Sequence, residues 1–137
     1  MRSPMPDFTI RGTLVPGKRL GTELSFPTAN LVCERQPGMP GDGVYIAEAT
    51  IDGRRYVGVL NQGKHPTAPE GAPTIETHLI GYTGGDLYGH EITLTYRRFL
   101  RPEKRFDSLD ELRAQLAEDV RAAADWATHE GGSHESD

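Results

Sequence analysis

Short segments with alternating polar and apolar residues recur along most of the chain and predict β-strands. Their apolar positions are rich in β-branched and aromatic side chains, and Gly, Pro or Asp separates one segment from the next. The expected strands are residues 8–15, 44–51, 56–60, 75–80 and 91–99. Between two of them, Asp52 and Gly53 predict a hairpin turn. Strands at this spacing, with no helix between them, favour a small closed or nearly closed antiparallel barrel.

Near the C-terminus the pattern changes from strand to helix. Apolar residues recur there at the spacing of one helix face, which we expect to pack on the barrel: Leu109, Leu112, Leu116, Val120 and Ala123. Ser108, followed three residues later by Glu111, predicts a capping box at the helix start. The residues that follow are polar. We therefore expect one domain over residues 1–128 and a disordered tail over residues 129–137.

Composition narrows the class of protein. A chain of 137 residues can build one core without disulfides, and its single cysteine, Cys33, excludes an internal one. The formal net charge of −5 argues against a general nucleic-acid binder, because such domains are usually basic. The first ten residues lack an apolar leader, and no apolar run reaches the ~20 residues of a membrane span. We expect a cytoplasmic monomer that binds neither nucleic acid nor membrane.

Residues 25–31, Ser-Phe-Pro-Thr-Ala-Asn-Leu, are the first candidate for binding chemistry. Pro27 restricts the backbone, so Thr28 and Asn30 follow a strand-like path with both side chains on one face. Residues 17–21, rich in Gly, Lys and Arg, precede them and offer unobstructed N–H groups beside cations. This pairing suggests phosphate and metal binding. The alternative is that Thr28 and Asn30 only shape a turn through hydrogen bonds to the backbone.

Glu76 is the candidate for proton chemistry. In the strand predicted over residues 75–80, Glu76 and His78 share one face, which is more polar than the other. A carboxylate there can accept the proton of an alcohol that attacks a phosphorus atom. The strand pattern alone leaves the alternative that this face is simply solvated.

Residues 58–64 read Gly-x-x-x-x-Gly-Lys, as in a phosphate-binding P-loop. His65 then replaces the Ser or Thr whose hydroxyl binds Mg²⁺, and Pro66 and Pro69 follow. No amphipathic helix comes next to present its N-terminus to a phosphate. We therefore interpret this segment as the end of a strand that opens a substrate-facing loop.

An ordered series of motifs covers about residues 8–119. The motifs are Phe26-Pro27-Thr28-Ala29-Asn30-Leu31, Gly43-Val44-Tyr45, Gly58-Val59-Leu60-Asn61-Gln62-Gly63, Glu76-Thr77-His78, Asp86-Leu87-Tyr88-Gly89 and Leu100-Arg101-Pro102-Glu103-Lys104, the last followed by Phe106-Asp107-Ser108-Leu109. In this order they make the chain similar to the ATP-dependent riboflavin kinase family. The resemblance implies a six-stranded antiparallel Greek-key barrel with a C-terminal helix, consistent with the strand pattern.

The resemblance implies that ATP and a divalent ion bind at the Pro-Thr-Ala-Asn motif. Thr28 and Asn30 would hold Mg²⁺ and the ATP phosphates, which suits an ion that prefers oxygen ligands. Gly17 would contact the nucleotide through its backbone. Leu79 and Tyr88 occupy positions that line the nucleotide pocket in the family, although Tyr88 has ordinary core packing as an alternative.

The resemblance implies riboflavin as the second substrate. Glu76 matches the catalytic base, which takes the proton of the terminal ribityl hydroxyl as that oxygen attacks the γ-phosphate of ATP. Arg101, Lys104 and Phe106 match the segment that approaches the flavin.

FMN is the expected product, because the chain has no room for the adenylyltransferase that many bacterial relatives carry to make FAD. The alternative is a non-catalytic module that uses the same pocket to bind flavin or nucleotide as a sensor or carrier. The presence of Thr28, Asn30 and Glu76 together argues against it, because flavin binding alone requires no base beside a metal site.

Overall fold

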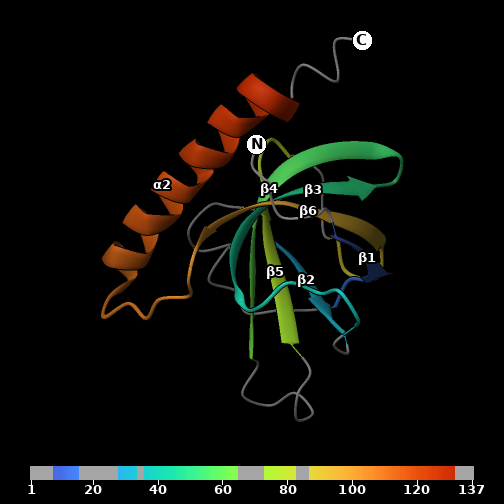
Figure 1. Cartoon of the computed structure of the whole chain (residues 1–137), viewed down its shortest axis with the longest axis horizontal. Helices are drawn as coiled ribbons and strands as arrows, with labels where there is room; N and C mark the ends of the chain where they lie inside the picture. Colours follow the sequence, from blue (N-terminus) through green and yellow to red (C-terminus); the bar gives the residue numbers. More distant parts are fainter. Residues whose placement is uncertain (1–7, 16–27, 34–35, 65–72, 83–86, 132–137) are drawn as a thin grey trace.

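The computed structural model describes residues 8–15, 28–33, 36–64, 73–82 and 87–131, which form one antiparallel sheet and a C-terminal helix (Figure 1). In chain order the elements are β1 (Phe8–Thr13), β2 (Thr28–Val32), β3 (Gly43–Ile51), β4 (Arg54–Lys64), β5 (Pro73–Leu79), β6 (Glu91–Arg101), α2 (Leu109–Trp126) and η1 (Ala127–Gly131). The predicted mainly β class is confirmed. The segment with P-loop-like spacing is the end of β4, as expected, although the strand continues to Lys64 and not only to the predicted residue 60.

The strands pair in the order β1-β6-β3-β4-β5-β2, and every pairing is antiparallel. β1 and β2 are therefore consecutive in the described chain but lie at opposite edges of the sheet. The sheet curls until these edges meet, where the N–H of Val15 donates to the carbonyl of Asn30 at 2.9 Å. This curled half-barrel agrees with the expected Greek-key barrel.

The turn between β3 and β4 is the predicted hairpin. Asp52 and Gly53 both have positive φ angles, 52° and 80°. Two such residues in succession give a type I′ turn, whose twist matches that of the flanking strands. Asp and Gly adopt this conformation at lower cost than most residues.

The main core fills the inside of the half-barrel. Alternate residues of each strand point inwards, and Leu60, Ile75 and Tyr96 have no exposed surface. The rings of Phe8 and Tyr45 pack edge-on against Tyr96, with centroids 5.5 and 5.1 Å away. A slip of one residue in any strand would turn such side chains outwards, so this core fixes the register.

The helix α2 lies along the outside of the sheet (Figure 1). Its Ala123 packs on Val44, Ile46 and Val59, with Trp126 beside them. The apolar stripe was expected to pack along its whole length, and this is wrong at Leu109, which is 48% exposed. The first turn of α2 stands away from the sheet in Figure 1, so no strand is there to cover it.

The predicted cap at the start of α2 is present in a modified form. Ser108 Oγ accepts a hydrogen bond from the N–H of Glu111 at 3.2 Å. The Glu111 carboxylate accepts from the N–H of Asp107, one residue earlier than in a standard capping box. At the other end, residues 127–131 add one π turn. The tail expected from residue 129 therefore begins as helix, and residues 132–137 lie outside the described part.

Candidate functional site

A row of polar residues crosses the outer face of β2, β5 and β4. The register places Asn30 opposite Glu76, and Asn61 opposite Glu76 on its other side. Residues opposite each other in adjacent antiparallel strands point to the same face, with Cβ atoms about 4.5–5.5 Å apart. Glu76 therefore lies between two amide residues that are far from it in sequence.

The surroundings of Glu76 are not those of a simply solvated face. Its neighbours Ile75 and Thr77 point into the core and are 0% exposed, whereas Glu76 is half-buried on the outer side. Asn30 is only 8% exposed and His78 only 7%. A carboxylate next to buried polar groups is partly shielded from water, which strengthens its interactions with nearby charges.

The two residues predicted to hold the metal both belong to β2. Thr28 is two residues before Asn30, and its register partner is His78. Mg²⁺ takes oxygen ligands and usually keeps waters and substrate phosphates in most of its coordination sites. The described residues contain no group of three or more His, Cys, Asp or Glu that could hold a metal.

His78 is a neutral member of this face. Burial lowers its pKa to about 4, although the nearby Asp119 carboxylate acts in the opposite direction. The imidazole is therefore uncharged near pH 7. It adds no positive charge beside the position where a cation is expected.

Tyr88 lies in the turn before β6. It is 57% exposed, so the alternative that Tyr88 is ordinary core packing is wrong. Its turn is attached to the end of β1, because the N–H of Gly89 donates to the carbonyl of Leu14 at 2.9 Å. The next residue, Val15, forms the bridge to Asn30. The turn that carries Tyr88 is therefore connected through two hydrogen bonds to the strand that carries Asn30.

Leu79, predicted to line the nucleotide pocket, is not brought to this row. Leu79 is 1% exposed and belongs to the main core, so its side chain points to the opposite face from Glu76. Gly17 lies outside the described residues. Leu79 thus packs in the core, on the inner side of the strand that carries Glu76.

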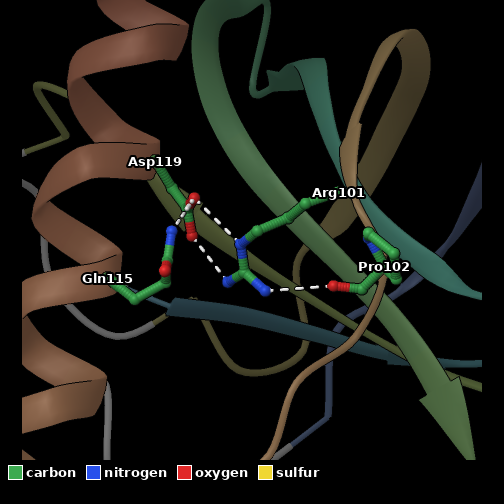
Figure 2. Close-up of polar contacts among 4 residues, drawn as sticks. All are labelled: Arg101, Pro102, Gln115 and Asp119. Atoms are coloured by element: carbon green, nitrogen blue, oxygen red, sulfur yellow. Dashed lines mark hydrogen bonds and ion pairs between the residues drawn. The ribbon is translucent and has the colours of Figure 1, made fainter.

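Arg101, predicted to lie on the flavin side, extends from the end of β6 to α2 (Figure 2). Its Nη2 donates to Asp119 Oδ2 at 2.7 Å and its Nε donates to Oδ1 at 3.1 Å. Gln115 Nε2 donates to the same Oδ1 at 3.1 Å, and Arg101 Nη1 donates to the carbonyl of Pro102 at 3.1 Å. The guanidinium group is thus held by the helix.

Lys104 and Phe106, the other two residues predicted on the flavin side, line a hollow of about 370 Å³ against the first half of α2. The remaining lining residues are Glu111, Ala114, Gln115 and Glu118. Lys104 Nζ lies 5.6 Å from the centroid of the Phe106 ring, within the range of a cation–π contact. The hollow offers an aromatic ring with a cation beside it. Arg101 is not among its lining residues.

The two groups of residues lie on one line across the sheet. Asn61 is opposite Val44 in β3, and Val44 is opposite Arg101 in β6. Glu76 and Arg101 are therefore three strand-to-strand steps apart. At about 4.8 Å a step, the path along the sheet is about 14 Å. Val44, in the middle of this path, is 1% exposed and packs with Ala123 of α2, so the helix covers the sheet between the two groups.

A polar network around Gln62 connects Pro40 and Asp42 to β4 and β6. Gln62 is 0% exposed, and its Nε2 donates to the carbonyl of Pro40 at 2.9 Å and to Asp42 Oδ1 at 3.1 Å. Its Oε1 accepts from the Tyr96 hydroxyl at 2.5 Å. The bond to Tyr96 is buried and the other two are part-buried, so Gln62 ties Pro40 and Asp42 to the barrel from inside.

Glu103 approaches the sheet at Gly63. A Cβ atom at Gly63 would lie only 2.0 Å from Glu103 Oε2, so a larger residue there would displace the carboxylate. Partial burial, and then the Asp42 carboxylate, raise the pKa of Glu103.

Sequence reasoning missed three contributors, Asn61, Gln62 and Asp119. Asn61 and Gln62 belong to a quoted motif, but alternation alone does not tell which polar residue of a strand joins the site. Asp119 interrupts the apolar face of the predicted helix. A carboxylate at such a position signals a buried partner, because an isolated buried charge is costly.

None of the helices that the structure describes is long and apolar enough to cross a membrane.

Among curated proteins, a bifunctional riboflavin kinase/FMN adenylyltransferase of Escherichia coli K12 is 41% identical over 120 residues, which is 87% of this chain and 38% of that protein. An RNA-binding riboflavin kinase of Bacillus subtilis is 39% identical over 116 residues, covering 84% of this chain and 49% of that protein. The chain thus spans less than half the length of these two relatives.

The fold has a counterpart among solved structures. Riboflavin kinase from Trypanosoma brucei matches with a TM-score of 0.64 at 23% identity, covering 91% of this chain and 82% of that one. The family model described as riboflavin kinase (flavokinase) matches residues 5–127, and so includes the polar row, the hollow and the Arg101–Asp119 pair. The chain belongs to the riboflavin kinase family.

Proposed function

We propose that this chain transfers the γ-phosphoryl group of ATP to the ribityl 5′-hydroxyl of riboflavin and so forms FMN and ADP. The observation that carries the proposal is the register of β2 and β5, in which Asn30 is directly opposite Glu76. A residue suited to a metal and phosphates thereby lies beside a carboxylate suited to a hydroxyl proton. Phosphoryl transfer needs these two functions at one place.

In the proposed reaction Glu76 acts as the general base. The hydroxyl oxygen forms a bond to the γ-phosphorus while the bond from that phosphorus to the bridging oxygen of ADP breaks. The hydroxyl proton passes to the Glu76 carboxylate. Thr28 and Asn30 bind the divalent ion and the phosphates. When bound, Mg²⁺ neutralises negative charge on the phosphate oxygens.

Riboflavin binding is assigned to the hollow beside α2. The Phe106 ring offers a face for the flavin ring system, and Lys104 offers a cation to its polar edge or to the phosphate of the product. We assign the ribityl chain to the space between this hollow and the base. Tyr88 is assigned to the rim of the nucleotide side.

The test is FMN formation from riboflavin and ATP, followed by chromatography with and without Mg²⁺. Glu76→Gln should lower kcat by about 10²- to 10⁴-fold, the usual contribution of a general base. Glu91→Gln, which removes an exposed carboxylate at the start of β6, is the matched control and should be as active as the wild type. Asn30→Ala should raise the KM for Mg·ATP more than that for riboflavin.

Riboflavin binding by the wild type without product, with any nucleoside triphosphate and divalent ion, would instead support the non-catalytic module. Equal loss of activity in Glu76→Gln and Glu91→Gln would refute the role of Glu76 as base.

We also infer a monomer that does not bind RNA, on the basis of the net charge of −5. One relative is named as RNA-binding, so this needs a direct test. The mass is measured by size-exclusion chromatography with light scattering. RNA binding is tested by gel-shift titration with single-stranded and hairpin RNA at low salt. A dimer mass, or a shift at micromolar protein that weakens with salt, would contradict the inference.

A further inference from the structure

Asp119 is a buried carboxylate in the middle of a helix. It is 4% exposed and lies on the face of α2 that packs against the sheet, where an apolar residue would be expected. Burying a charge is costly unless it is paired and hydrogen-bonded. Here it accepts three hydrogen bonds, two from the Arg101 guanidinium and one from Gln115. The two bonds from Arg101 form a bidentate fork, which fixes orientation as well as distance.

Stability alone is a weak explanation for this arrangement. Apolar residues of similar volume often replace a buried ion pair with no loss of stability, since desolvation offsets most of the attraction. A bidentate pair gives a fixed geometry that apolar packing does not supply.

Arg101 transmits the orientation to the segment after β6. Its Nη1 donates to the carbonyl of Pro102, the first residue of that segment. Its guanidinium carbon lies 6.0 Å from the centroid of Phe106, and Lys104 contacts the same ring at 5.6 Å. The ring is thus in contact with two cations, one of which is anchored to α2 through Asp119. The same helix supplies Gln115 to the wall of the hollow.

We propose that Asp119 is a positioning residue for riboflavin, acting through Arg101 to hold Phe106 and Lys104 in the geometry that accepts the flavin ring. Gln115 assists by fixing one carboxylate oxygen of Asp119. The inference rests on the proposed function, because it assigns riboflavin to this hollow. It gives Arg101 a supporting role and not a direct contact with the flavin.

The test is Asp119→Asn, which keeps the size of the side chain but removes its charge. Riboflavin KM, and the riboflavin Kd from quenching of flavin fluorescence, should each rise about tenfold or more, because a displaced binding wall misplaces the substrate. The KM for Mg·ATP should stay within about twofold of the wild type. Asp119→Glu, which retains the charge, should recover part of the riboflavin affinity.

The matched control is Glu48→Gln. Glu48 forms another part-buried ion pair, with Arg97 Nη2 at 2.6 Å, and its side chain is 12% exposed. The variant loses the same charge on a different part of the barrel, so it reports the effect of a broken ion pair alone. It should leave the riboflavin Kd unchanged.

Three results would overturn the inference. They are an unchanged riboflavin Kd in folded Asp119→Asn, an equal rise in Glu48→Gln, and a parallel rise in the KM of both substrates. If Asp119→Asn does not fold, Gln115→Ala is the second test, because it removes one hydrogen bond to Asp119. It should raise the riboflavin Kd about two- to threefold, and an unchanged Kd would again refute the inference. If the wild type neither binds nor phosphorylates riboflavin, the proposed function itself fails, which is a separate outcome.

Discussion

Acidification should destabilise this protein through His78, by an amount that follows from its burial. The imidazole has a pKa of about 4 in the folded chain, against 6.5 for an unburied histidine. Because the folded-state value is the lower one, the unfolded chain takes up a proton first as the pH falls. The stabilisation is therefore fully present above pH 6.5 and is lost progressively down to about pH 4.

The gap between the two pKa values sets the size of the effect. At about 1.4 kcal/mol per pH unit, the total is about 3 kcal/mol, of which about 2 kcal/mol is lost by pH 5. Asp119 limits the loss because its negative charge favours the protonated imidazole. An effect of this size is a large fraction of the net stability of a domain, typically about 5–15 kcal/mol.

Urea unfolding of the wild type and His78→Gln at pH 7.5, 6 and 5 isolates this contribution from other titrating groups. Trp126 is the single tryptophan, and as the last residue of α2 it packs against the cluster of Val44, Ile46 and Val59, so its fluorescence reports the transition. The wild-type advantage over the variant should shrink by about 2 kcal/mol between pH 7.5 and 5. His129→Gln, at an exposed position in η1, is the control and should keep the wild-type pH dependence. Parallel curves for the wild type and His78→Gln would refute the argument from burial.

Three further substitutions test the fold that supports the site, each by urea unfolding at pH 7.5. Ser108→Ala removes the cap of α2 and should cost about 1 kcal/mol, whereas a loss below about 0.3 kcal/mol would mean that the cap contributes little. Tyr96→Phe leaves Gln62 Oε1 without the hydroxyl it accepts from and should cost about 1–3 kcal/mol; a neutral result would show that water replaces the hydroxyl. Gly58→Ala places a Cβ atom 2.7 Å from the backbone oxygen of His78 and should cost about 1–3 kcal/mol. Gly41→Ala, where nothing lies within 4 Å, is its control, and equal losses in the two would contradict the packing argument.

Local sequence signals predicted most of the secondary structure. Alternation in β3 and β6, the Asp52-Gly53 turn and the Ser108 cap each depend on a few neighbouring residues, and each occurs close to the predicted place. The errors in the predicted strand ends lie at positions whose structure depends on residues distant in sequence. The end of β4 was placed too early because Gly63 resembles a loop residue, although it is a glycine at which Glu103 approaches closely.

The candidate site shows the same division. From the sequence, Thr28 and Asn30 were expected on one face of a strand, and Glu76 on the polar face of another. Their proximity depends on the pairing of β2 with β5. β2 is an edge strand of the sheet, and β5 follows it in the chain only after β3 and β4. The order of motifs shared with the riboflavin kinase family implied one site. The spacing of residues along the chain does not give the distance between two strands.

Short-range periodicity and motifs in order were enough to predict the strand and helix types, the turn, the cap and the family. The folded molecule was needed to learn that Asn61 flanks Glu76, that burial keeps His78 neutral, and that Arg101 is bound to Asp119. Register and burial are set jointly by all strands that share the core. A residue's partner and its solvent exposure therefore depend on side chains distant in sequence, which no local pattern specifies.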